Sequence, residues 1–68
     1  MSAVIRVNGQ DEQVSAVTVA ELLAARGITK PKGVAVALNG AVVPRAAWPA
    51  TRLHPGDSVE IVRARQGG

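Results

Sequence analysis

The sequence contains no cysteine, phenylalanine or tyrosine, and only one tryptophan and one histidine. Without cysteine the chain forms no disulfide bond and offers no thiolate to a metal or a substrate. A lone histidine does not build a zinc site. The net charge of +3 suggests nucleic acid, but the eight basic residues are scattered and no Phe or Tyr is present to stack on bases. A nucleic-acid partner is therefore not expected.

Long apolar runs are also missing, and none approaches the ~20 residues of a membrane-spanning helix. The first residues, MSAVIRVNGQ, do not pair a basic segment with a long apolar one, as a secretory signal does. We therefore expect a cytoplasmic protein with no membrane partner. Its 68 residues suffice for one small domain built largely from Ala and Val, without a deep pocket. A self-contained enzyme is not expected.

The first half of the chain predicts a hairpin followed by a helix. Residues 3–7 alternate in polarity like a half-buried strand, and an Asn8-Gly9 turn leads into a returning strand over 12–16. Thr18 fits a helix N-cap, with Glu21 three residues later to bond the free N–H of the cap residue. Gly27 lies where a left-handed residue ends a helix, so we expect a helix over 19–26.

The second half predicts three further strands. Residues 34–38 are apolar on both faces and precede a second Asn-Gly turn, after which a short strand ends at Pro44. A helical turn is expected over 46–48. Residues 54–57, HPGD, fit a type II turn, and residues 58–62 alternate as the last strand.

This order predicts an α+β domain with the β-grasp, or ubiquitin-like, fold. One main helix would pack across one face of a mixed sheet of four to five strands, with the first and last strands parallel at its centre. We expect residues 1–63 to form this domain. Residues 64–68 would form a flexible C-terminal tail that leaves the end of the last strand.

Catalytic motifs are not found along the chain. Glu21 is assigned to the helix cap and Asp57 to a turn, and the serines have no nearby histidine or aspartate partner. His54 is expected to be exposed, and Trp48 is expected to fill the core in preference to anchoring a partner. The chain end, RARQGG, is then the one segment left to explain.

Two terminal glycines are either a frayed end or a terminus thin enough to enter a narrow active site. Behind a β-grasp domain we favour the second interpretation. The carboxylate of Gly68 would attack the α-phosphate of ATP in an activating enzyme, through a channel that excludes any Cβ. Arg63 and Arg65 either keep the chain soluble or pair with acidic or phosphate groups of that enzyme.

Over nearly its whole length the chain resembles the ThiS family, the bacterial sulfur carriers of thiamin biosynthesis. The segments that carry the resemblance are TVAELLAARGI, VAVALNGAVVPRAAW, RLHPGDSVEIV and the final QGG. The Val-Pro-Arg-x-x-Trp pattern from Val43 to Trp48, followed by Gly-Asp and then Gly-Gly, is specific. Arg65 is a difference, because many members have an apolar residue there.

The resemblance implies a protein co-substrate that is not a catalyst and binds no metal or cofactor itself. A ThiF-like enzyme using Mg and ATP would adenylate Gly68, and sulfur from a cysteine desulfurase or persulfide carrier would convert the adenylate to a thiocarboxylate. A ThiG-like thiazole synthase would then take the sulfur. Gly67, Gln66 and Arg65 would form the tail that enters partner active sites.

Other functions remain open at this point. The small subunit of molybdopterin synthase shares the fold and the Gly-Gly end, but it is usually longer and fits the Val-Pro-Arg-x-x-Trp pattern poorly. A carrier for cysteine or thionucleoside synthesis, or a modifier joined to lysines, is harder to separate by sequence. A β-grasp binding module for RNA would not need the last two glycines, and its binding would fall steeply with salt.

Overall fold

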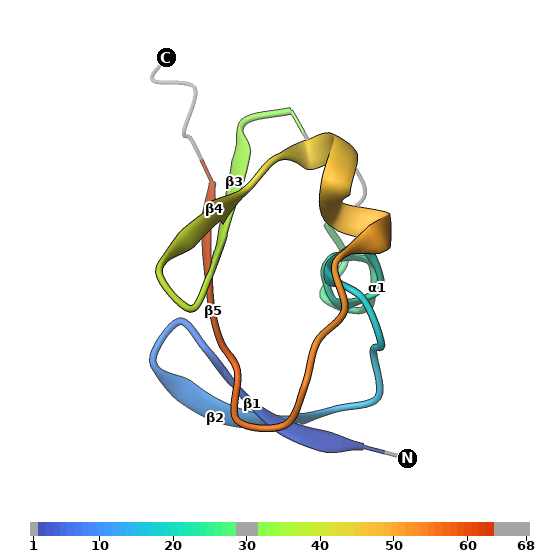
Figure 1. The fold of residues 1–68 in the computed structure, drawn as a ribbon, viewed down its shortest axis with the longest axis vertical. Coiled ribbons are helices and arrows are strands. Elements are labelled where there is room, and N and C mark those ends of the chain that lie inside the picture. Colours follow the sequence, from blue (N-terminus) through green and yellow to red (C-terminus); the bar gives the residue numbers. More distant parts are fainter. Residues whose placement is uncertain (1, 29–31, 64–68) are drawn as a thin grey trace.

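The structure is a computed structural model that describes residues 2–28 and 32–63. In these residues a five-stranded sheet is covered on one face by an α-helix and a 3-10 helix (Figure 1). The elements are β1 (Ala3–Val7), β2 (Gln10–Val14), α1 (Val19–Ala25), β3 (Val34–Leu38), β4 (Ala41–Val43), η1 (Arg45–Ala50) and β5 (Ser58–Arg63).

The strands lie in the order β2-β1-β5-β3-β4. β1 and β5 are parallel, and the other neighbouring pairs are antiparallel. This arrangement confirms the predicted β-grasp fold, with the first and last strands side by side at the centre of a mixed sheet.

Both Asn-Gly pairs form two-residue hairpin turns. The φ angles are 50° and 84° at Asn8-Gly9 and 51° and 86° at Asn39-Gly40, the left-handed conformations that such turns require. The flanking residues pair directly, Val7 with Gln10 and Leu38 with Ala41. β2 consequently begins at Gln10, two residues before the predicted start, because pairing resumes as soon as the turn is complete.

Helix α1 begins and ends as its sequence signals predict. The Thr18 hydroxyl accepts the N–H of Glu21 at 3.2 Å, and the Glu21 carboxylate accepts the N–H of Val17 at 2.9 Å. The carboxylate was expected to bond the N–H of Thr18, so that detail was wrong by one residue. An isolated β-bridge pairs Thr18 with Arg52 at the start of the helix. The local sequence does not predict this contact, because the two residues are far apart in the chain.

At the other end, Gly27 has a φ of 79°, and the N–H of Ile28 bonds the carbonyl of Leu23 at 2.9 Å, as in a Schellman motif. Arg26 is the C-cap residue, so α1 ends one residue before the predicted boundary. Neither helix of the residues that the structure describes is long and apolar enough to cross a membrane.

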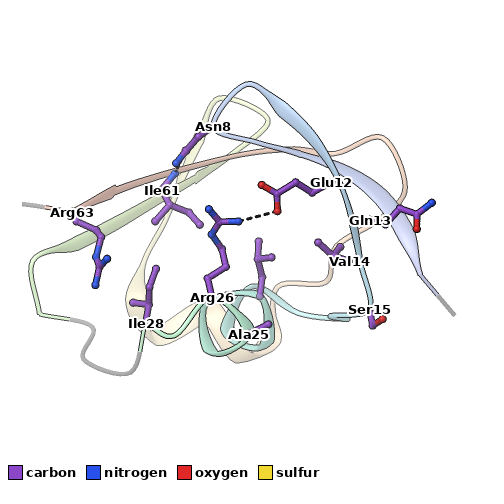
Figure 2. A pocket seen from close by; sticks show the side chains of 11 residues that line it. Asn8, Glu12, Gln13, Val14, Ser15, Ala25, Arg26, Ile28, Ile61 and Arg63 are labelled. Carbon is purple, nitrogen blue, oxygen red and sulfur yellow. Dashed lines mark hydrogen bonds and ion pairs between the residues drawn. The ribbon is translucent and has the colours of Figure 1, made fainter.

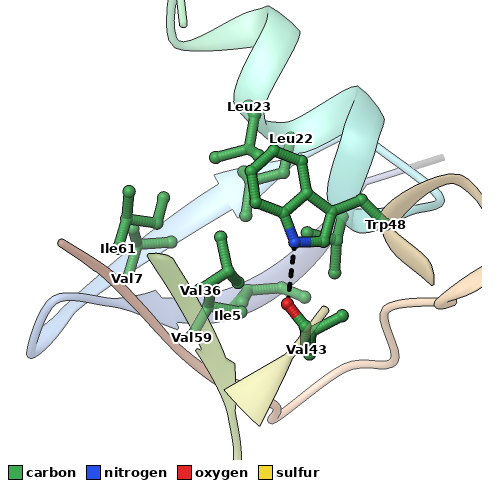
Figure 3. Packing of buried hydrophobic residues seen from close by; sticks show 10 residues of the cluster. Ile5, Val7, Leu22, Leu23, Val36, Val43, Trp48, Val59 and Ile61 are labelled. Atoms are coloured by element: carbon green, nitrogen blue, oxygen red, sulfur yellow. Dashed lines mark hydrogen bonds between the residues drawn. The ribbon is translucent and has the colours of Figure 1, made fainter. Parts of the chain in front are cut away.

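The core lies between the sheet and the two helices (Figure 3). Trp48 is 6% exposed, and its indole N–H donates to the carbonyl of Val43 at 2.9 Å, so the predicted core role is confirmed. η1 is longer than the expected turn over 46–48. The buried apolar side chains are Ile5, Val7, Val19, Leu22, Leu23, Val36, Val43, Trp48, Val59 and Ile61.

Candidate functional site

The strand that leads to the C-terminus, β5, lies at the centre of the sheet. It pairs with β3 from Val59 to Arg63 and with β1 at Ser58 and Val59. On its inner face Val59 is fully buried and Ile61 is 9% exposed. Because β5 is bonded on both sides and packed into the core, the position of Arg63 is set by the rigid part of the fold.

Asn8 fixes β5 near its C-terminal end. β1 ends at Val7, and the N–H of Asn8 makes one further backbone bond to β5, to the carbonyl of Val59 at 2.9 Å. The side-chain oxygen of Asn8 accepts the next N–H that faces it, that of Ile61, at 2.8 Å in a partly buried position. The turn residue thus continues the bonding of β5 where the strand beside it ends.

Asn39 fixes the start of β5 from the opposite side. Its side-chain oxygen accepts the N–H of Ser58 at 2.9 Å, and its amide nitrogen donates to Asp57 Oδ1 at 3.1 Å. The second oxygen of Asp57 accepts the backbone N–H of His54 at 2.7 Å. These bonds close the turn, whose Gly56 has a φ of 87°, and confirm both the type II geometry and the turn role of Asp57.

Sequence reasoning missed the strand-anchoring role of the two asparagines. The Asn-Gly pattern predicts a turn whatever the asparagine side chain contacts. The only signal was the choice of Asn at both turns, since Gly and Asp are also favoured there. The residues that bond to the two asparagine side chains are distant in the sequence: Ser58 is 19 residues after Asn39, and Ile61 is 53 residues after Asn8.

Four of the five side-chain carboxylates bind other residues of the described fold. Asp11 pairs with Arg6 at 3.3 Å on the sheet, and Glu12 pairs with Arg26 at 2.9 Å between β2 and α1. Glu21 and Asp57 are used by the helix cap and the turn, and Glu60 is exposed on β5. His54 has a side chain that is 72% exposed, as predicted. Among the described residues no group of three His, Cys, Asp or Glu side chains is placed to hold a metal ion.

The face of the sheet away from α1 carries exposed apolar side chains that sequence reasoning did not single out. Val42 on β4 is 77% exposed and Val62 on β5 is 61% exposed. The register places Ala35 beside Val62 and Ala37 beside Val42. β3 thus supplies small residues between the two valines, and an apolar strip reaches the C-terminal end of β5.

The predicted site residues Arg65, Gln66, Gly67 and Gly68 lie outside the described residues, as does the rest of the predicted tail over 64–68. Arg63, the last residue described, is exposed at the end of β5 and lies opposite Val34 of β3. The described part of the site is therefore the anchored strand from which the C-terminal residues follow.

Comparison with known proteins identifies a family and solved structures that are similar to this chain. The sequence model of the ThiS family matches residues 5–68. A crystal structure of the thiamine biosynthesis protein ThiS from Geobacter metallireducens is 37% identical, with a TM-score of 0.79 and coverage of 100% of both chains. A solution NMR structure of a thiamine biosynthesis protein from that organism is 37% identical with a TM-score of 0.80, covering 96% of this chain and 87% of that chain. Among curated proteins none matches.

Proposed function

The chain belongs to the ThiS family of small sulfur carrier proteins, and from this we propose that Gly68 carries sulfur as a thiocarboxylate for the synthesis of the thiazole ring of thiamin. The observation that carries the proposal is that the family match extends to residue 68, so that it includes the terminal Gly-Gly. In this role the protein is a co-substrate of other enzymes and not a catalyst.

Activation of Gly68 would proceed by two displacements. A terminal carboxylate oxygen attacks the α-phosphorus of ATP, bound with Mg in a ThiF-like enzyme, and pyrophosphate leaves. A sulfur nucleophile then attacks the carbonyl carbon of the acyl-adenylate, and AMP leaves. With sulfide the product is the thiocarboxylate directly. With a persulfide, a thiol must cleave the resulting acyl disulfide and is itself oxidised to a disulfide.

The chain's own residues would present the reacting group. Gly67 and Gly68 have no Cβ, so a channel that excludes larger residues can admit them. Gln66 and Arg65 would lie at the mouth of that channel, with Arg65 available to pair with acidic or phosphate groups. The anchoring of β5 by Asn8 and Asn39 supports this role, because it fixes the point from which the terminal residues extend.

Partner enzymes would need a surface to hold the carrier while the end reacts. The apolar strip that includes Val42 and Val62 reaches the end of β5 and is suited to such contacts. We propose a ThiF-like adenylating enzyme and a ThiG-like thiazole synthase as these partners, with a cysteine desulfurase or persulfide carrier as the source of sulfur. We propose that these reactions take place in the cytoplasm, because the adenylating partner needs a supply of ATP.

The test is to incubate the full-length chain with the adenylating enzyme, Mg-ATP and sulfide, and to measure the intact mass. We expect a gain equal to the difference between sulfur and oxygen. Deletion of Gly68, or Gly67→Trp, should abolish the gain in mass. The deletion moves the terminal carboxylate back by one residue, away from the ATP, and the tryptophan side chain blocks the channel.

Arg52→Gln is a matched control, since Arg52 is exposed and distant in sequence from the terminus, and it should be modified like the parent chain. Both terminal variants should unfold at the parent's urea midpoint, because they change no residue of the sheet. A chain without Gly68 that still gains sulfur would contradict the proposal.

A further inference from the structure

β2 has one edge without a strand partner among the described residues, because it is the first strand in the sheet order. The N–H of Arg6 in β1 bonds to the carbonyl of Asp57, directly before β5 and on the β5 side of β1. Since alternate residues of a strand direct their backbone groups to opposite sides, Ile5 bonds in the other direction, to Glu12 of β2. Asp11 and Gln13, on either side of Glu12, therefore direct their N–H and C=O groups to the free edge.

Beside this edge a groove of about 630 Å³ lies between β2 and the C-terminal half of α1 (Figure 2). Leu22 of α1 and Ile61 of β5 form its buried floor, and the half-buried side chains of Val14 and Ile28 supply its accessible apolar surface. The groove thus offers apolar surface next to unpaired backbone donors and acceptors. An extended peptide needs both to bind along a strand.

The charged lining is not balanced. Arg26, the C-cap residue of α1, reaches across to Glu12 of β2 at 2.9 Å, and each side chain is 35% exposed (Figure 2). Arg63 lines the groove from the end of β5, and the ion pairs of the described residues do not include it. The described charges of the lining, Glu12, Arg26 and Arg63, therefore sum to +1, which favours a bound carboxylate.

We propose that this groove binds an extended, acidic and apolar segment of a partner protein, which adds to the sheet as a strand beside β2. Backbone bonds to Asp11 and Gln13 would hold the segment. Its apolar side chains, at alternate positions, would face Val14 and Ile28, and a carboxylate on the same face would pair with Arg63.

A second copy of this chain is a poorer occupant of the same edge. The β2 strand of a second copy has only one apolar residue, Val14, to place in the groove. The inference uses β2 and α1 and does not require the terminal glycines, so it stands or falls separately from the proposed function of Gly68.

The experiment titrates the ¹⁵N-labelled full-length chain with two capped peptides that alternate valine with serine. In one peptide the last valine is replaced by glutamate and in the other by lysine, so that the charge lies on the same face as the valines. The glutamate peptide should shift the amide signals of residues 11–15 and 25–28. The lysine peptide should bind about fivefold more weakly, because it places a cation at Arg63.

Two substitutions locate the contacts. Gln13→Pro removes one outward N–H without loss of a bond to β1, and should weaken the glutamate peptide about fivefold, whereas Gln13→Thr keeps the donor and the affinity. Arg63→Gln should remove most of the preference for glutamate over lysine. Arg45→Gln, an exposed arginine of η1, should retain it.

Equal binding of the two peptides by the parent chain would overturn the proposal. Shifts confined to the strip around Val42 and Val62 would overturn it too, as would β2 signals that respond to protein concentration without peptide, since that indicates self-association. If Gln13→Pro does not fold, the comparison between Arg63→Gln and Arg45→Gln still decides the matter.

Discussion

Asn8 and Asn39 occupy the same position in two hairpin turns, with φ angles of 50° and 51°, but their side chains hold different ends of β5. Asn8 makes one bond, to the N–H of Ile61, in a partly buried position. Asn39 makes two, to the N–H of Ser58 and to the carboxylate of Asp57, and both are exposed.

The difference shows that the same type of turn can stabilise a neighbouring strand in two different ways. Asn8 supplies an acceptor at a point where a strand has stopped, so nothing else in the described chain pairs with the N–H of Ile61 on that side. Asn39 belongs to a network in which Asp57 and the turn also hold the start of β5. We therefore expect β5 to depend more on the single bond than on the pair.

The largest expected effect is that of Asn8→Ala. It leaves the partly buried N–H of Ile61 without its acceptor and places an alanine in a left-handed conformation, for a combined loss of about 2–3 kcal/mol in the free energy of unfolding. Urea denaturation followed by circular dichroism measures it. Asn8→Gly removes the bond but not the permissive backbone, and should lose about 1–2 kcal/mol. Equal losses for the two variants would show that backbone strain is not part of the effect.

Asn39→Ala is expected to have a smaller effect, about 1–2 kcal/mol, by the same measurement. Both of its bonds are exposed, so water can replace the lost partners of Ser58 and Asp57. Asp57 should keep the turn closed through its bond to His54. A loss as large as that of Asn8→Ala would contradict the proposed ranking.

Substitution of either asparagine by aspartate is expected to change the free energy of unfolding least, and it separates the roles of the two side chains. Asn8→Asp keeps an oxygen acceptor for Ile61 and should change stability by less than about 0.5 kcal/mol. Asn39→Asp keeps the acceptor for Ser58 but turns a donor into an oxygen that faces the Asp57 carboxylate, and should lose about 0.5–1 kcal/mol. Raising the salt concentration should reduce the second loss by screening and leave the first variant unchanged. Indistinguishable variants at low salt would mean that the bond from Asn39 to Asp57 contributes nothing.

The elements themselves could be predicted from the sequence because their signals are local. The two Asn-Gly pairs, the cap at Thr18 and the ending at Gly27 each act within a few residues, and each is found where expected. The parallel pairing of the first and last strands also followed, since the order of elements leaves few other ways to cover one face of a sheet with one helix.

What could not be predicted depends on contacts between distant segments. The bond from Asn8 to Ile61 joins residues that meet only through the parallel register, and the bridge from Thr18 to Arg52 joins two residues that are distant in the sequence. The groove beside β2 has the same origin, because α1, β2 and β5 each contribute part of its lining. The proposed reacting end was predicted from two terminal glycines behind a β-grasp domain and from the resemblance to the ThiS family, and it lies outside the described residues.

The central place of β5 also has a mechanical consequence. A partner that pulls on the C-terminus would load β5 along its own axis, parallel to β1 and between β1 and β3. The backbone bonds that hold it run across that axis, so they would bear the tension together in shear instead of opening one after another. A partner enzyme that pulls on the C-terminal residues would therefore load a strand that resists unfolding, and the domain would keep its structure under this tension.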